Sequence, residues 1–279
     1  MAAAGPHVVL KGETVVSIYG FNVTNSLISS LIVTAFFAII AYAYYSESQK
    51  KEKSVFFYTI HGVISALYAL FESILKKNVK IFFPLLSSFF FFIILNNWFG
   101  LFPLVNSYYV TPITIGAEAP KMQTNGSTEK PEKAKETTSH SAKTNSEKES
   151  SDSDKPHKVP LLRGATADLN TTIALALISV VLTQIFGFRF IGAAEHLKKY
   201  ASPIGILEGF SEISRLLSFS FRLFGNIFAG EVMIGVIAFL AFFLTPPFFL
   251  LEVFVGFIQA VVFSMLTAVF INMAIQKHH

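Results

Sequence analysis

Long apolar runs separated by short polar stretches make up most of this sequence. Five of these runs are about as long as, or longer than, the ~20 residues that a helix needs to cross a bilayer. In lipid, only helices satisfy so many backbone polar groups within single segments. The pattern therefore predicts an all-α, polytopic membrane protein with about five membrane helices. We expect these helices at residues 21–46, 81–105, 167–194, 203–244 and 248–275.

Residues 55–77 follow a different pattern. Phe57, Ile64 and Leu67 fall near one helical face, and lysine clusters flank both ends of the stretch. An amphipathic helix lying in the membrane interface fits this pattern better than a span does. Short basic loops belong on the cytoplasmic side, so we expect residues 1–20 to form an external N-terminal segment.

The last two segments are long for a bilayer. As one helix, residues 203–244 would extend about 60 Å, about twice the thickness of the hydrocarbon core. Thr245, Pro246 and Pro247 then turn the chain into the final helix. We therefore expect a long, strongly tilted helical hairpin at the C-terminal end.

The charged residues gather outside the predicted spans. Eight lysines and eight acidic residues lie within residues 118–158, so we expect residues 106–160 to form an external, charged, disordered loop. The formal net charge of +4 comes with no basic patch interleaved with aromatic residues, which argues against a nucleic-acid partner.

Composition also limits metals, cofactors and location. The absence of cysteine excludes disulfides and thiolate metal sites, and His61, His140 and His157 show no ligand spacing, so we expect neither metal nor cofactor. The first apolar run lacks a basic leader and is long, which favours a retained span over a cleaved signal peptide. Without a transit segment, we expect a bacterial plasma (inner) membrane rather than an organelle.

Arg222 lies inside the fourth apolar run. Its guanidinium cannot lose a proton, and a charge in the middle of a bilayer costs ~3 kcal/mol. Five polar residues share its helical face within about 40°. They are Glu208, Ser211, Arg215, Ser218 and Asn226. We expect the two serines to bond back to their own helix. No acid of this chain is evident opposite Arg222, so we expect another protein to supply its counter-ion.

A second group of polar residues points toward a path from the outside. Glu231 faces about 180° away from Arg222, whereas Glu252 and Gln259 share one face of the final segment. The hairpin brings Glu231 and Glu252 to similar depth, and Asp168 and Asn170 begin the third span nearby. Glu252 has an alternative interpretation, because a carboxylate so close to the turn can also snorkel to the interface.

Other polar residues have simpler interpretations. Asn96, Asn97 and Trp98 are expected to mark the membrane interface, where indole is enriched. Glu212 and Arg215, near the inner end of the fourth segment, are expected to be solvated.

Five blocks of the sequence resemble one known family. They are "GFNVTNSLISSLIV" (20–33), "NNWFGLFP" (96–103), "ADLNTTIALAL" (167–177), "ISRLLSFSFRLFGNIFAGE" (213–231) and "IQAVVFSMLTAVFINMA" (258–274). In order and spacing the chain resembles the a subunit of F-type ATP synthases, the stator of the proton channel. The resemblance covers nearly all of the chain except residues 106–160.

The resemblance implies a role for each matching residue. Arg222 would face the ring of c subunits, with Asn226 and Gln259 beside it. The outer half-channel would contain Asp168, Asn170, Glu231 and Glu252, and the cytoplasmic half-channel Glu208. The implied partners are the c ring, the b subunit of the peripheral stalk, other ATP synthase subunits and membrane lipid. No catalytic site is implied in this chain, since ATP chemistry lies in soluble subunits.

Two other classes of protein also use buried ionisable groups. A secondary ion transporter remains the alternative, although the sequence shows no internal repeat and no matching pair of broken helices. The sequence lacks the catalytic residues of an intramembrane hydrolase, because it contains no Ser/His pair, HExxH motif or acid dyad in facing spans.

Overall fold

The computed structural model describes residues 12–19, 21–102, 105, 108–115, 159–192 and 203–276, with side chains omitted for residues 18, 21, 109, 113–115 and 203–208. Within these residues, five helical segments are long and apolar enough to cross a membrane. The predicted class, an all-α polytopic membrane protein, is confirmed. One of the five segments, Val55–Gly100, contains two helices joined by a tight turn.

The helices follow the apolar runs closely. They are α1 (Asn25–Ser48), α2 (Val55–Leu75), α3 (Val79–Gly100), α4 (Leu169–Ile191), α6 (Pro203–Leu240) and α7 (Thr245–Ile275). Short 3-10 turns are η1 (Lys76–Asn78), η2 (Ala165–Ala167) and η3 (Phe242–Leu244). The 38 residues of α6 make it about 57 Å long.

Polar caps and prolines set where several helices begin. Thr24 accepts a hydrogen bond from the backbone N–H of Leu27, and Ser54 accepts one from Phe56. Asp168 does the same at the start of α4. These side chains satisfy N–H groups that a first turn leaves without partners. At α7 the first turn contains two prolines, which have no N–H to satisfy.

Five short strands lie outside the described helices and were not predicted. Strand β1 (Thr14–Ile18) pairs antiparallel with β2 (Phe21–Thr24) and parallel with β4 (Ile113–Ile115). Strand β3 (Tyr109–Val110) pairs with β5 (Val159–Pro160). The first helix therefore begins at Asn25 rather than 21, and both ends of the 106–160 segment contain strand. Residues 116–158 lie outside the described part.

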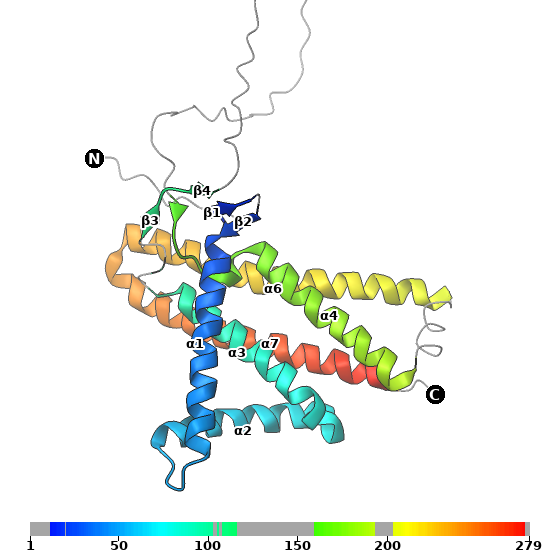
Figure 1. Cartoon of the computed structure of the whole chain (residues 1–279). Helices are drawn as coiled ribbons and strands as arrows, with labels where there is room; N and C mark the ends of the chain where they lie inside the picture. The colour runs from blue at the N-terminus through cyan, green and yellow to red at the C-terminus, as the bar shows by residue number, and fades with distance from the viewer. Residues whose placement is uncertain are drawn as a thin grey trace, which may run out of the picture.

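The helices cross at wide angles. Figure 1 shows the strands near the upper end of α1 and α2 running across its lower end. Helices α6 and α7 pack side by side as a hairpin that also runs across the direction of α1. A hairpin in this orientation is what the sequence predicts when two long helices must fit one bilayer.

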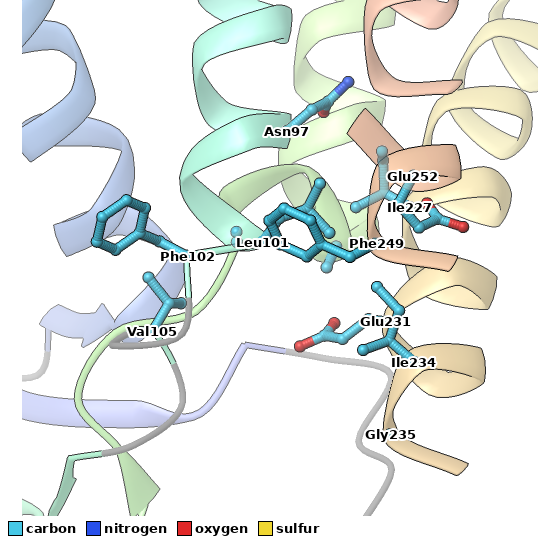
Figure 2. A pocket seen from close by; sticks show the side chains of 13 residues that line it. Asn97, Leu101, Phe102, Val105, Ile227, Glu231, Ile234, Gly235, Phe249 and Glu252 are labelled. Atoms are coloured by element: carbon cyan, nitrogen blue, oxygen red, sulfur yellow. The ribbon is translucent and has the colours of Figure 1, made fainter. Parts of the chain in front are cut away.

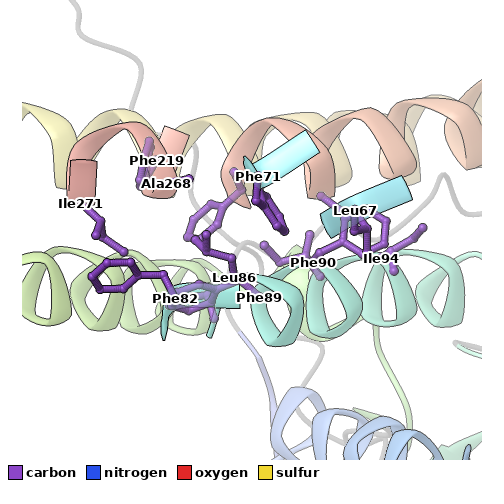
Figure 3. Close-up of a cluster of buried hydrophobic side chains, with 14 of the residues drawn as sticks. Leu67, Phe71, Phe82, Leu86, Phe89, Phe90, Ile94, Phe219, Ala268 and Ile271 are labelled. Carbon is purple, nitrogen blue, oxygen red and sulfur yellow. The ribbon is translucent and has the colours of Figure 1, made fainter. Parts of the chain in front are cut away.

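Aliphatic and aromatic side chains together fill the core between α2, α3, α4, α6 and α7 (Figure 3). The Phe263 ring contacts Phe89 at 5.6 Å and Phe219 at 5.0 Å, measured between ring centroids. Phe82 contacts Phe186 edge to face. Such pairs add to the stability that burial alone gives. By contrast, many apolar side chains of α1 are exposed, which leaves that face for lipid or another subunit.

Two glycines let the end of α3 meet the chain before η2. A Cβ atom added to Gly164 would lie 3.1 Å from the Cα atom of Gly100. Because backbone cannot move aside as a flexible side chain can, we expect Gly164→Ala to destabilise the fold by about 1–3 kcal/mol. The measurement is the melting temperature of the purified protein in detergent.

Gly62→Ala is the matched control, because a Cβ added at this helical position meets no described atom within 4 Å beyond its chain neighbours and the helix's own backbone. Alanine has the higher helix propensity, so the control should melt at or slightly above the wild-type temperature. Equal melting temperatures for the two variants would contradict the close approach.

Candidate functional site

A cavity of about 220 Å³ opens where α3, η2, α6 and α7 meet (Figure 2). Its walls come from the end of α3 and the residues after it, from Gly164 and Ala167, and from one face of α6. The cavity lies at the strand end of the molecule, which the sequence predicts to be external. Most of its lining is apolar, so its few polar groups define its chemistry.

Two carboxylates line this cavity, Glu231 from α6 and Glu252 from α7. Figure 2 shows Glu252 directed toward α6 and Glu231 directed across the cavity toward the residues that follow α3. Gly230 makes room for this arrangement, because a Cβ atom there would overlap the Glu252 carboxylate. Glu252 is only 4% exposed, which favours the interpretation as a cavity residue over snorkelling.

Asn97 and Trp98 fix α7 against α3. The side-chain amide of Asn97 donates to the carbonyl of Gly256 at 3.1 Å, and the indole N–H of Trp98 donates to the carbonyl of Val253 at 3.1 Å. Asn97 is buried and lines the cavity. The expectation that these residues only mark the interface therefore missed their role in holding α7.

An amide pair joins α6 and α7 next to one end of the cavity. Asn226 of α6 donates from Nδ2 to Oε1 of Gln259 on α7 at 3.0 Å. Ile227, next to Asn226, is the first α6 residue that lines the cavity, and the lining continues to Gly235. The cavity thus begins beside the amide pair, and the pair lies one helical turn from Arg222.

Arg222 is exposed on the outer face of α6. Its guanidinium donates a long hydrogen bond, 3.4 Å, to Ser218 Oγ. Among the described side chains no carboxylate lies within 4.0 Å of it. Ser211 accepts a bond from Arg215 in the same way, so each serine serves an arginine one turn later instead of its own backbone.

Inward of Arg222, polar residues connect α6 to its neighbours. Gln184 of α4 donates a short hydrogen bond to Glu212. The guanidinium of Arg215 lies 4.0 Å from the centre of the Phe270 ring on α7. The expectation of simple solvation was thus wrong for both residues. Glu208 is in α6, but its side chain lies outside the described residues.

Asp168 is buried beside the cavity wall but does not line it. Its Oδ2 accepts from the Ser26 hydroxyl at 2.6 Å, and its Oδ1 accepts from the backbone N–H of Asn170 at 3.0 Å. These bonds tie the start of α4 to the start of α1. The Asn170 side chain is exposed and does not line the cavity.

One residue at the site was missed by the sequence analysis. Arg163, in the chain before η2, places a guanidinium nitrogen 3.8 Å from a carboxylate oxygen of Glu231. The available signal was its position five residues before Asp168, beside small residues that allow close packing. Arg163 lies in a loop, and a loop has no regular spacing of residues from which a facing side chain can be inferred.

Comparison with known proteins decides the family. The family model described as ATP synthase A chain matches residues 26–272, which include every helix that forms the site. This chain belongs to the ATP synthase A chain family. The residues of the family match thus contain both the exposed arginine and the two cavity carboxylates.

Relatives named ATP synthase subunit a agree with this assignment. The protein of Syntrophobacter fumaroxidans is 41% identical over 130 residues, which cover 43% of this chain and 54% of the relative. The chloroplastic protein of Stigeoclonium helveticum is 41% identical over 125 residues, 42% of this chain and 49% of the relative. The match therefore spans about half the length of these two relatives.

A Legionella pneumophila relative of the same name aligns along nearly the whole chain. It is 26% identical over 266 residues, which cover 94% of this chain and 91% of the relative. With five apolar helices and bacterial members of the ATP synthase A chain family as relatives, the chain is a multi-pass protein of the bacterial inner membrane.

The cavity should admit water-soluble reagents. The chain has no cysteine, so Ile234→Cys introduces one thiol into the cavity wall. We expect a small, charged thiosulfonate added from the outside to label it at least about tenfold faster than a thiol packed in the core. Labelling is measured in membranes by mass spectrometry.

Ser264→Cys provides the core thiol for comparison, since Ser264 is fully buried and the replacement is close in size. Equal labelling rates at positions 234 and 264 would contradict a water-accessible cavity.

Proposed function

We propose that this chain is the proton-translocating a subunit of an F-type ATP synthase, which forms two half-channels that meet a rotating ring of c subunits at Arg222. The observation that carries the proposal is an exposed guanidinium on a membrane-spanning helix, with no carboxylate of the described side chains near it. Lipid cannot neutralise that charge, and arginine cannot lose it. A carboxylate on a partner subunit that passes this face supplies the counter-ion for Arg222.

The proposed outer half-channel uses the cavity. A proton enters from the external side and is relayed by Glu231 and Glu252, whose carboxyl groups can bind and release it. Asn226 and Gln259 then form the inner end of this path, and hydrogen-bonded water connects them to the ring carboxylate beside Arg222. Asp168 and Asn170 belong to the outer end of the path, where they shape the wall around it.

The proposed inner half-channel begins on the other side of Arg222. Glu208 is its acid near the cytoplasm, and the bond between Gln184 and Glu212 supports a polar contact between α4 and α6 along the same route. The buried hydroxyls of Ser179 and Thr267, 2.9 Å apart, add a further polar contact between α4 and α7. Protons released by the ring leave through this region.

Arg222 makes transport depend on rotation. A ring carboxylate crosses lipid cheaply only when it is neutral. Near the guanidinium the ionised form is favoured, so each ring site gives up its proton to the inner path before it passes and accepts a new one from the outer path afterwards. The driving free energy is ~2.3 kcal/mol per charge per 100 mV.

The proposed partners follow from this mechanism. They are the c ring, the b subunit of the peripheral stalk and the soluble sector in which ATP chemistry occurs. No bond of a substrate is made or broken by this chain in the proposal, and no cofactor is needed. Membrane lipid covers the remaining apolar surface.

We expect Arg222→Ala to abolish ATP synthesis driven by a proton gradient, because the ring carboxylate loses its counter-ion and the two paths lose their separation. The complex should still assemble, since the side chain is exposed and has one long hydrogen bond. Synthesis is measured in energised vesicles and normalised to the assembled complex.

Arg189→Ala is the charge-matched control, because Arg189 is exposed in the last turn of α4. It should leave synthesis within about twofold of wild type. Gradient-driven synthesis that persists in Arg222→Ala would refute the proposed function.

We expect Gly230→Ala to slow passive proton conduction by about tenfold, because the added methyl group displaces the Glu252 carboxylate from its position. Conduction is measured as the decay of a pH gradient across vesicles from which the soluble sector has been removed.

Gly209→Ala is the control on the same helix, since a Cβ added there meets no described atom within 4 Å beyond its chain neighbours and the helix's own backbone. Unchanged conduction in Gly230→Ala would mean that the position of Glu252 does not limit the outer path.

A further inference from the structure

Arg163 is a buried cation directly behind the cavity. Its side chain is 7% exposed, whereas the Glu231 side chain that it contacts is 29% exposed. Glu231 and Gly164 line the cavity, and Arg163 itself does not. The carboxylate therefore faces the cavity while the guanidinium approaches it from within the protein.

The backbone around Arg163 is held by other parts of the fold. Its N–H donates to Ser29 Oγ of α1 at 3.1 Å. The next residue, Gly164, packs against Gly100 at the end of α3. The turn η2 that follows is buried throughout. The backbone from which the Arg163 side chain extends is thus held by contacts with α1 and α3 and by the buried turn η2.

Two features make this ion pair relevant to the cavity. Glu231 and Glu252 both line it, so two carboxyl groups, each able to carry a negative charge, share a small, mostly apolar space. A buried cation near one of them reduces their repulsion, and a buried guanidinium in turn requires a negative partner. The pair also connects the rigid chain before η2 to α6, the helix that carries Arg222.

We propose that Arg163 is a positioning residue of the outer half-channel, which holds the Glu231 carboxylate at the cavity wall and offsets its charge. This inference rests on the proposed function, because Glu231 matters only where protons pass. Arg163 acts through Glu231 and not by carrying a proton, since its guanidinium stays charged. Its effect on conduction should therefore disappear when Glu231 is replaced.

The test compares Arg163→Gln, Glu231→Gln and the double variant in the assembled complex. Passive proton conduction is measured in vesicles lacking the soluble sector and is normalised to the amount of assembled complex. We expect Arg163→Gln to lower conduction by about tenfold, as misplacement of a functional group does. The double variant should conduct at least as fast as Glu231→Gln alone, because no unpaired buried cation remains.

Rescue by lysine separates the charge from a packing role. The guanidinium nitrogen lies 3.8 Å from the Glu231 oxygen, so a single ammonium group can replace it. Neither glutamine nor lysine can make the packing contacts of the guanidinium, but lysine keeps the positive charge. Arg163→Lys should therefore recover a substantial part of the conduction that Arg163→Gln loses. Arg189→Gln, at an exposed position, controls for loss of one positive charge and should conduct like wild type.

Three results would overturn the inference. The first is an Arg163→Gln variant whose conduction, divided by the amount of assembled complex, equals that of wild type. This holds even if less complex assembles, because the residue would then affect only assembly. Another is a double variant whose loss equals the product of the two single losses. The third is Arg163→Lys as slow as Arg163→Gln. The proposed function fails separately: if Arg222→Ala still synthesises ATP, the stator assignment is wrong whatever Arg163 does.

Discussion

Lipid offers no hydrogen-bond partners, and this constraint decides where each polar side chain of the long helices can lie. Asn97 and Trp98 reach carbonyl groups of α7, Asn226 reaches Gln259, and Gln184 reaches Glu212. Each of these bonds joins two helices, so the polar residues that hydrocarbon excludes become the contacts that set helix positions. Arg222 differs, because the hydrogen bond that it makes among the described residues is to a serine of its own helix.

The same constraint explains why the two proposed paths are separate. The cavity with Glu231 and Glu252 ends beside the amide pair, and the contact between Gln184 and Glu212 lies on the other side of Arg222 along α6. Between them the core is aromatic, with Phe219 and Phe263 in contact. A proton can move along carboxyl groups and water but not through packed phenyl rings. Continuous conduction would therefore need a mobile group that visits both sides.

Much of the fold could be predicted from the sequence. The apolar runs gave each long helix to within a few residues, because length and hydropathy decide what crosses a bilayer. The face shared by Arg222, Ser218 and Asn226 followed from helical periodicity. The prolines at 246 and 247 likewise marked the start of α7.

The remaining features depend on contacts between distant segments. The ion pair of Arg163 and Glu231 joins a loop to a helix, and no local pattern links the two. Strand β1 pairs with β4, which precedes the charged segment, and β3 pairs with β5 across that segment. Composition alone could not reveal either pairing. Tertiary neighbours decide both of these features. Ser211 and Ser218 were expected to bond back to their own helix, and they do so by accepting from the arginine one turn later.

The aromatic contacts of α6 have a mechanical consequence. In the proposed function, a ring that turns past Arg222 would pull α6 sideways with every step. Phe219, less than one turn from Arg222, contacts Phe263 and Phe270 of α7 and would transmit that force to them. Phe263 also contacts Phe89 of α3, so the load would spread into a close-packed group of helices. These contacts would keep the guanidinium in place while the proposed partner subunit moves.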